Sequence, residues 1–152
     1  NTPCYSYYSW DAATLGSGRG ISTDNTDAQY SICPKGWKLP TSRTTSAANW
    51  QTKSDFYVLA HQYGLDSTTS TSESDNGFYT QAGPGTVPNF LLAGYYYNGS
   101  FDVGGSSGYY WSSTSYGNSL YARNLYFDSS YVNSANSNPR RLGFSVRCLV
   151  AE

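Results

Sequence analysis

The chain has 152 residues and a formal net charge of −1, and only 12% of its side chains are charged, whereas 17% are aromatic. It is too poor in Lys and Arg to form a basic face, which argues against a nucleic-acid partner and against electrostatic attachment to a membrane. No run approaches the roughly 18 apolar residues of a membrane span. We expect one domain over residues 1–152, which lacks an initial Met and could be the C-terminal part of a longer protein.

The N-terminal half predicts an irregular entry followed by one main helix. A helical turn is expected at residues 10–14, and a strand-like segment ends at Pro40. The spacing of apolar residues predicts a helix over residues 46–62, with Gly64 as its stop signal. The Ser- and Thr-rich stretch 65–77 is typical of an exposed loop.

The C-terminal half predicts a hairpin and then a series of strands. Residues 90–105 carry an Asn-Gly turn signal, Asn98–Gly99, between two strand candidates. Further strands are expected at residues 108–113, 120–127, 131–134 and 142–149. The side chains that these strands should bury are Leu120, Leu125, Phe127, Phe144 and Val146. The two tryptophans that we interpret as core aromatics are Trp37 and Trp111.

The aromatic and cysteine content bears on where the protein is located. Sixteen Tyr and four Trp against a single His are typical of secreted recognition proteins, so we expect an extracellular or cell-surface location. Cys4, Cys33 and Cys148 lack the spacing of metal ligands, which argues against a structural zinc site. An odd number leaves one cysteine over, and spacing alone does not assign the pairing. The alternative is three reduced, buried cysteines in a cytosolic protein.

One segment has a composition that predicts a function. Residues 109–138 hold six Tyr, eight Ser and five Asn, but no Lys, Glu, Gln, Met or His. Tyr supplies rigid contact area and Ser and Asn supply adaptable hydrogen bonds, as in antibody paratopes. We therefore interpret this segment as strands that present a ligand-binding face. The residues expected to face the ligand are Tyr109, Tyr110, Ser115, Tyr116, Asn118, Tyr121, Asn124, Tyr126, Asp128, Tyr131, Asn133, Asn136 and Asn138.

Three motifs carry a resemblance to a known family. "CPKGWKLPT" (33–41), "YYWSST" (109–114) and "GFSVRC" (143–148) together resemble the bacterial FISUMP-type paralogous domains. Those domains are similar to C-type-lectin-like domains, a group that includes formylglycine-generating enzymes and the variable proteins of diversity-generating retroelements. The resemblance implies an α+β, C-type-lectin-like fold with short twisted antiparallel sheets, one or two helices and long loops. It also implies a Cys33–Cys148 disulfide, because the last strand of such folds returns beside the early part of the chain. Cys4 would then be free or paired with an upstream cysteine.

The resemblance also narrows the function. Sugar-binding C-type lectins hold calcium through a carboxylate and an amide at positions where this chain has Ser112 and Ser113. Because these serines lack the ligands that calcium requires, we expect no calcium-bridged sugar site. In retroelement variable proteins, rewriting of adenines in Asn codons yields residues such as Tyr, Ser and Asp, which resembles the composition of 109–138. We expect an adhesion or recognition domain, diversified or fixed, for a protein or glycan on another cell or surface. The alternative is a surface-fibre or envelope module whose Tyr-rich face packs against neighbouring copies.

Catalytic signals are weak, and we expect no enzymatic activity, no catalytic residues, no cofactor and no metal. Nucleophilic catalysis needs a nucleophile near a base, which is usually a histidine. The single histidine, His61, lies near the end of the expected helix, where we interpret it as a surface residue. The formylglycine-generating relatives have a reactive pair of cysteines late in the fold, whereas this chain has only Cys148 in that region. Asp24, Asn25 and Asp27 lack the Gly and distal Glu of an EF-hand loop, so we expect a turn there.

Overall fold

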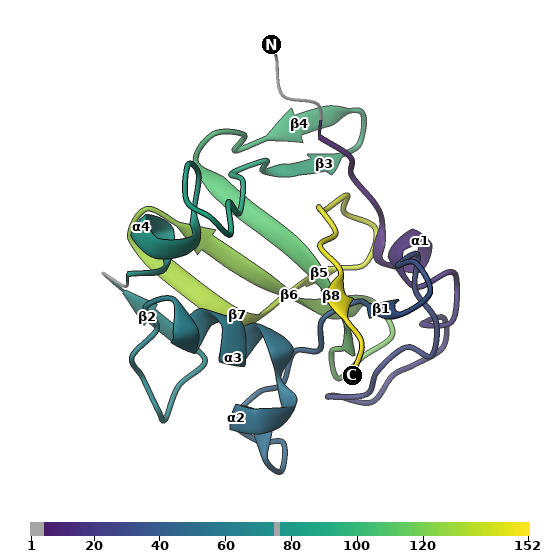
Figure 1. The fold of residues 1–152 in the computed structure, drawn as a ribbon. Helices are drawn as coiled ribbons and strands as arrows, with labels where there is room; N and C mark the ends of the chain where they lie inside the picture. The colour runs from purple at the N-terminus through teal and green to yellow at the C-terminus, as the bar shows by residue number, and fades with distance from the viewer. Residues whose placement is uncertain (1–4, 75–76) are drawn as a thin grey trace.

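The computed structural model describes residues 5–74 and 77–152, and it is an α+β fold, the class that the resemblance implies. Cys4 lies outside the described residues. The helices are short: α1 (Trp10–Ala13), α2 (Trp50–Lys53), α3 (Asp55–Gln62) and α4 (Phe78–Ala82). They surround a central antiparallel sheet (Figure 1). Among the described residues, no helix is long and apolar enough to cross a bilayer.

The central sheet has four strands in the order β2-β7-β6-β5. Its members are β2 (Ser72–Ser74), β7 (Tyr131–Pro139), β6 (Tyr121–Asp128) and β5 (Ser107–Ser115). Two small antiparallel ladders flank it, one joining β1 (Trp37–Lys38) to β8 (Leu149–Val150) and the other joining β3 (Tyr95–Tyr97) to β4 (Ser100–Asp102). The turn between β3 and β4 is Asn98–Gly99, with φ of 49° and 86°, so the predicted hairpin is confirmed.

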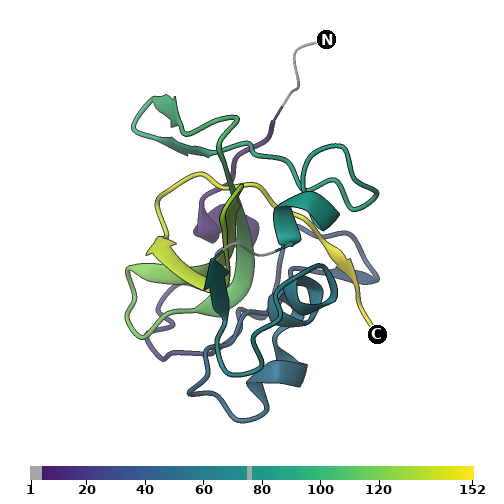
Figure 2. The same ribbon diagram turned by 90° about the vertical axis from the view of Figure 1, so that its left-hand side faces the viewer.

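One face of the central sheet packs against α3 and α4 (Figure 2). Because side chains alternate along a strand, Leu125, Phe127 and Val132 all point to this face, and each is fully buried. The ring of Phe127 lies 5.1 Å from that of Phe78 in α4, in an edge-to-face arrangement. This is the larger of two hydrophobic clusters, and it confirms the predicted burial of Leu125 and Phe127.

A second cluster forms around Trp10, Trp111 and Phe144. The indole of Trp111 stacks 4.2 Å from the ring of Phe144 and donates a 2.7 Å hydrogen bond to the carbonyl of Tyr8. Gly143 lets the chain pass closely here, since an added Cβ would lie 3.1 Å from the Cβ atoms of its neighbours. The predicted burial of Trp111 and Phe144 is confirmed.

A disulfide joins the segment before β1 to the segment before β8. Cys33 and Cys148 are bonded, with their Cα atoms 5.8 Å apart, which confirms the pairing implied by the resemblance. The predicted strand 142–149 is wrong for most of its length. Gly143 bonds to Tyr96, Phe144 to Tyr8, and Ser145 to Tyr109 and Trp111, so successive residues serve different segments and no continuous ladder forms. Only Leu149 of this range lies in a strand, β8.

The helix predicted over 46–62 is wrong over residues 46–49, and the rest of the range is divided into α2 and α3. The chain breaks at Ser54, which is extended (φ −102°, ψ 104°), and the main helix starts at Asp55. The Ser54 hydroxyl accepts hydrogen bonds from the amides of Tyr57 and Arg43, so it caps α3 instead of continuing a helix. The end at Gln62 is as predicted, and Gly64 has a φ of 116° that favours glycine.

Three further expectations are corrected. The stretch 65–77 is not all loop, because Ser72–Ser74 add β2 to the edge of β7 through backbone bonds, which polar side chains permit. Leu120 is 68% exposed in the β5–β6 turn, and Val146 is only half-buried. Trp37 is exposed, since β1 is a two-residue strand on the rim and not part of either core.

Candidate binding face

The face of the sheet opposite α3 and α4 carries a row of tyrosines. Tyr109 on β5 lies directly across from Tyr126 on β6, with ring centroids 5.0 Å apart. Tyr131 on β7 follows at 6.0 Å from Tyr126, and Tyr95 from β3 closes the other end at 5.4 Å from Tyr109. We call these four residues the tyrosine row. Each is half-buried, so every ring is held by its neighbours while part of it meets solvent.

Two carboxylates flank the tyrosine row. The hydroxyl of Tyr95 donates to Asp102 at 2.9 Å, and that of Tyr126 donates to Asp128 at 2.6 Å. Burial opposes the charge on Asp128, but hydrogen bonds from Tyr126 and Ser130 outweigh it and lower the pKa of this carboxyl group. No ion pair to either carboxylate occurs within the described residues. The row therefore has a negative rim.

The central hydroxyl of the row stays protonated. Burial raises the pKa of Tyr109 to about 12, and the carboxylates of Asp102 and Asp128, together with Tyr126 and Tyr95 as they ionise, add to this effect. Burial and the hydrogen bond to Asp128 also raise the pKa of Tyr126. The bond to Asp102 raises the pKa of Tyr95. Near neutral pH Tyr95, Tyr109 and Tyr126 thus offer neutral phenols that can donate and accept hydrogen bonds.

An asparagine cluster continues the same face. Asn124 on β6 donates to Asn138 at 3.0 Å, and Asn136 donates to Asn124 at 3.1 Å and to Asn138 at 2.9 Å. Asn124 is fully buried, whereas Asn136 and Asn138 are half-buried. No further side-chain bond occupies the Asn138 amino group within the described chain, so this cluster keeps hydrogen-bonding capacity toward solvent.

A β-bulge brings these residues together. Tyr126 pairs with Asn133 but Asn124 pairs with Asn136, so two steps on β6 match three on β7. The extra residue puts Asn133 and Asn136 on one face, although strict alternation would separate them. Eight residues expected to face the ligand share this face, with Asn124 buried within it. They are Tyr109, Asn124, Tyr126, Asp128, Tyr131, Asn133, Asn136 and Asn138.

The other expected ligand-facing residues lie elsewhere. Tyr110 points to the helix side, where it is buried and its hydroxyl bonds to both backbone groups of Leu91. Ser115 is buried and donates to the carbonyl of Thr23. The expectation that all thirteen side chains are exposed is therefore wrong for Tyr110, Ser115 and Asn124. Strand alternation explains Tyr110, which is the neighbour of Tyr109 and so faces the other way.

Three of the expected residues gather at the β5–β6 turn, away from the row. The rings of Tyr116 and Tyr121 lie 5.9 Å apart, and the guanidinium of Arg123 stands 4.8 Å from the Tyr116 ring centroid. The Asn118 side chain accepts bonds from the amides of Leu120 and Tyr121, so it shapes the turn.

Sequence reasoning missed two members of the face, Tyr95 and Asp102. Both come from the β3–β4 hairpin, outside the segment 109–138. The run Tyr95–Tyr97 beside the Asn-Gly turn was the signal that could have pointed to them, because it repeats the tyrosine enrichment of the later strands.

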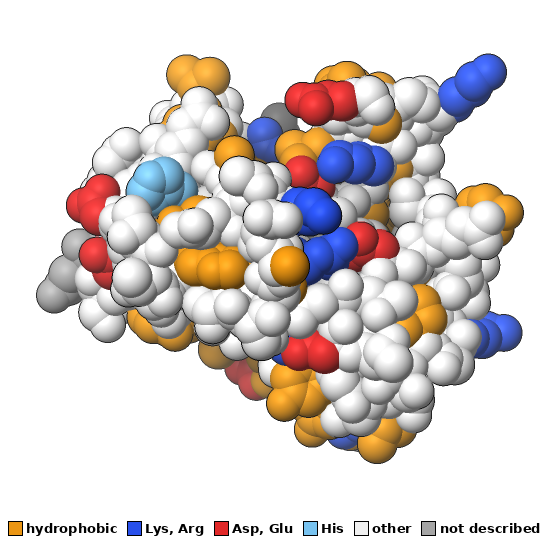
Figure 3. Space-filling view, turned by 90° about the horizontal axis from the view of Figure 1, so that it is seen from below, with side chains coloured by type: hydrophobic (Ala, Val, Ile, Leu, Met, Phe, Trp, Pro, Cys, Tyr) orange, Lys and Arg blue, Asp and Glu red, His pale blue; other side chains and the backbone are white. Residues whose placement is uncertain are grey.

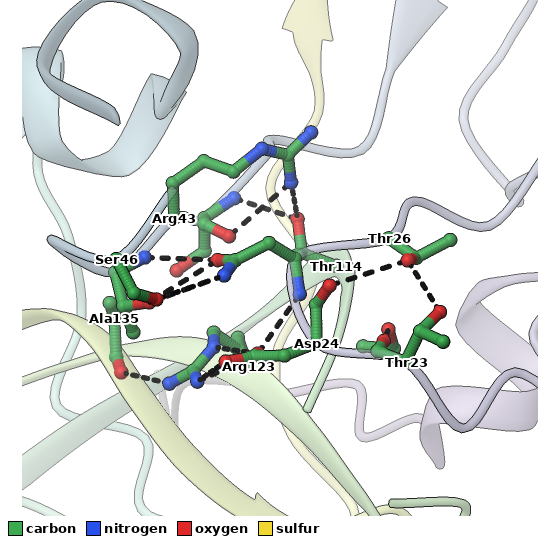
Figure 4. A network of polar contacts seen from close by, with 12 residues as sticks. Thr23, Asp24, Thr26, Arg43, Ser46, Thr114, Arg123 and Ala135 are labelled. Carbon is green, nitrogen blue, oxygen red and sulfur yellow. Dashed lines mark hydrogen bonds and ion pairs between the residues drawn. The ribbon is translucent and has the colours of Figure 1, made fainter. Parts of the chain in front are cut away.

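The acidic residues near the N-terminus form a structural network, and Figure 4 shows the part of it around Asp24 and Arg123. Asp24 receives bonds of 2.8 to 3.1 Å from the guanidinium of Arg123, which also donates to the carbonyl of Ala135 at 3.0 Å. Asp27 pairs with Arg43 in the same way. Asp24 and Asn25 form the expected turn. Both carboxylates thus hold the loop 21–28 against the sheet, and the described residues contain no group of three or more metal-ligating side chains.

Comparison with known proteins identifies a family. Residues 36–149 match the family described as a domain of unknown function (DUF8237), and the chain belongs to it. Neither the search of curated proteins nor that of solved structures found a match. The matched region contains the whole tyrosine row and the asparagine cluster, so the candidate face is part of the family domain.

Proposed function

We propose that this protein is a recognition domain that binds a protein or glycan ligand through the tyrosine row and the asparagine cluster. The observation that supports this most is the row itself, four half-buried tyrosines whose neighbouring rings lie 5.0 to 6.0 Å apart across four strands. A side chain already held by its neighbours loses little conformational entropy on binding. Tyrosine in that state supplies contact area together with a hydrogen-bonding tip.

The proposed setting is extracellular. The Cys33–Cys148 disulfide supports it, because such bonds persist in oxidising compartments. The proposed fold family is the C-type-lectin-like group, on the strength of the FISUMP resemblance. Short antiparallel ladders, few helices and a last strand beside the early chain are in keeping with that proposal.

The face serves the same purpose whether it is diversified or fixed. A reverse transcriptase gene beside a near-copy of the segment encoding residues 109–148 would mark a diversified binder. Neighbouring DNA without such a copy would leave a fixed binder.

A second candidate is a structural module that packs against its own copies. The β3–β4 hairpin favours it, because Phe101 is 67% exposed and lies 5.2 Å from the rings of both Tyr7 and Tyr96. Light scattering over a dilution series separates the two functions. A binder stays monomeric, whereas a packing module forms larger species as its concentration rises.

Binding to an array of cell-surface proteins and glycans tests the proposed function. The double variant Tyr126→Ser/Tyr131→Ser removes two rings of the row and should lose the array signals of the wild type. Tyr97→Ser removes an exposed tyrosine outside the row and should keep them. Equal loss in both variants, or signals unchanged in the double variant, would contradict the proposed face.

A further inference from the structure

A separate cavity of about 420 Å³ lies at the rim of the molecule, away from the tyrosine row. It forms between the loop 27–31 and the segment 33–41, which includes β1. This volume falls within the range of roughly 300 to 1,000 Å³ typical of small-molecule sites. Figure 3, which views the molecule from the side of α2 and the C-terminus, shows Lys and Arg side chains gathered around a hollow, with acidic side chains beside them.

Two exposed aromatic side chains line the cavity. Trp37 is 49% exposed and Tyr30 is 59% exposed, whereas Trp10 and Trp111 are almost fully buried. A tryptophan usually buries its large apolar surface, so an exposed indole in a cavity wall is unusual for packing alone. The backbone at Trp37 is held in the β1–β8 ladder, where it pairs with Val150, and the Cys33–Cys148 disulfide begins four residues earlier.

The polar groups of the cavity have unused hydrogen-bonding capacity. Asp27 is fixed because its Oδ1 accepts from Arg43 at 2.7 Å and from Thr114 at 2.6 Å. Among the residues that the structure describes, its Oδ2 accepts from Arg43 alone, and a third of the side chain is exposed, so one acceptor position remains. Within the described residues, the side chains of Gln29 and Lys35 make no hydrogen bond or ion pair. Both line the same cavity.

We propose that this cavity binds a saccharide, with a pyranose ring stacked on Trp37 and its hydroxyl groups bonded to Asp27, Gln29 and Lys35. A pyranose has an apolar C–H face and a polar rim, which match an exposed indole beside fixed polar groups. The carboxylate of Asp27, already oriented by its ion pair with Arg43, can accept a hydrogen bond from a sugar hydroxyl group at its remaining acceptor position. No metal ion takes part, so this site differs in chemistry from calcium-bridged sugar binding. It shares no residue with the tyrosine row and does not depend on the proposed function.

Saturation-transfer NMR with methyl pyranosides of glucose, galactose, mannose and N-acetylglucosamine tests this site. A single ring should bind with a dissociation constant of about 1 mM, near the affinity expected from one stacked face and a few hydrogen bonds. Trp37→Ala should abolish the transfer, and Trp37→Phe should restore part of it. Gln29→Ala should weaken binding about 5-fold through the loss of one hydrogen bond.

Matched controls separate the cavity from the rest of the surface. Tyr126→Ser, in the tyrosine row, should bind the pyranosides as the wild type does. Thermal unfolding of Trp37→Ala should match the wild type, which shows that lost binding is not lost folding. Transfer to none of the four pyranosides, or undiminished transfer in Trp37→Ala, would overturn the proposal.

Discussion

The two faces of the central sheet are built from alternate residues of the same strands, yet they have different surroundings. Phe127 on the helix side is fully buried against Phe78. Its neighbour Tyr126 points the other way, keeps part of its ring in solvent and bonds to Asp128. The difference teaches that alternation along a strand can separate residues that hold the fold from residues that remain available for binding.

The largest expected effect is on the helix side. Phe127→Ala leaves a cavity beside Phe78 and should lower the free energy of unfolding by about 3 to 5 kcal/mol. Denaturant unfolding measures this change, and Tyr126→Ser is the matched variant one residue away. If Tyr126→Ser destabilises the protein as much as Phe127→Ala does, the two faces do not divide stability from binding.

Loss of the disulfide should come next. Cys33 and Cys148 are 115 residues apart, and replacing both with Ser should cost roughly 2 to 5 kcal/mol of unfolding free energy. The bond lies at the β1–β8 rim, so ligand binding by the folded variant should be preserved at low temperature. A variant that unfolds at the wild-type denaturant concentration would contradict the stabilising role.

A buried arginine sharpens the comparison, because polarity alone does not make a residue a binding residue. Arg123 is 6% exposed in its side chain, and Arg123→Ala removes its bonds to Asp24 and Ala135, at a cost of about 1.5 to 3 kcal/mol. Arg19, which pairs with Asp11 on the surface, is the control and should change the melting temperature little when replaced with Ala. Equal effects of the two substitutions would count against the network in Figure 4.

Tyr109 and Tyr110 are adjacent residues that point to opposite faces of the sheet, and their phenol groups can be followed by titration with pH. Burial is the largest cause that raises the pKa of each to about 12, above the ordinary 10.0. The folded state therefore keeps protons that the unfolded chain loses. The stability that this contributes is complete below pH 10 and is lost as pH rises through about 12. In an absorbance titration, Tyr109→Phe and Tyr110→Phe should each remove one late phenol, whereas ionisation of both near pH 10 in the wild type would contradict their burial.

The smallest effect on stability is expected on the open face. Tyr131→Ser alters a half-buried side chain of the tyrosine row and should change the free energy of unfolding by only about 0.5 kcal/mol. Its effect should appear in ligand binding instead. Differential scanning calorimetry decides this, and a loss comparable to that of Phe127→Ala would assign Tyr131 to the fold.

Local signals in the sequence predicted part of the fold. The Asn98–Gly99 turn, the strands around Leu125 and Phe127, and the end of α3 follow from turn chemistry and periodicity, which act over a few residues. The break at Ser54 could not be predicted in this way, because its hydroxyl also accepts a bond from the amide of Arg43, eleven residues earlier.

The sequence predicted which residue types form the candidate face, but it did not predict which individual residues lie on it. Tyrosine and asparagine enrichment indicated a binding surface, whereas the bulge opposite Leu125 decides that Asn133 and Asn136 share it. Tyr95 joins through the packing of a separate hairpin, and Trp37 is exposed because β1 lies at the rim. These features depend on contacts between distant segments, which composition does not encode.

Tyrosine footprinting tests the central claim most directly. Each tyrosine of the wild-type protein is modified with and without a ligand retained on the array, and the change in its reactivity is measured by mass spectrometry. The account predicts that the ligand protects Tyr95, Tyr126 and Tyr131 and leaves Tyr97 and Tyr121 reactive. Protection of Tyr97 and Tyr121, with the row unchanged, would contradict it.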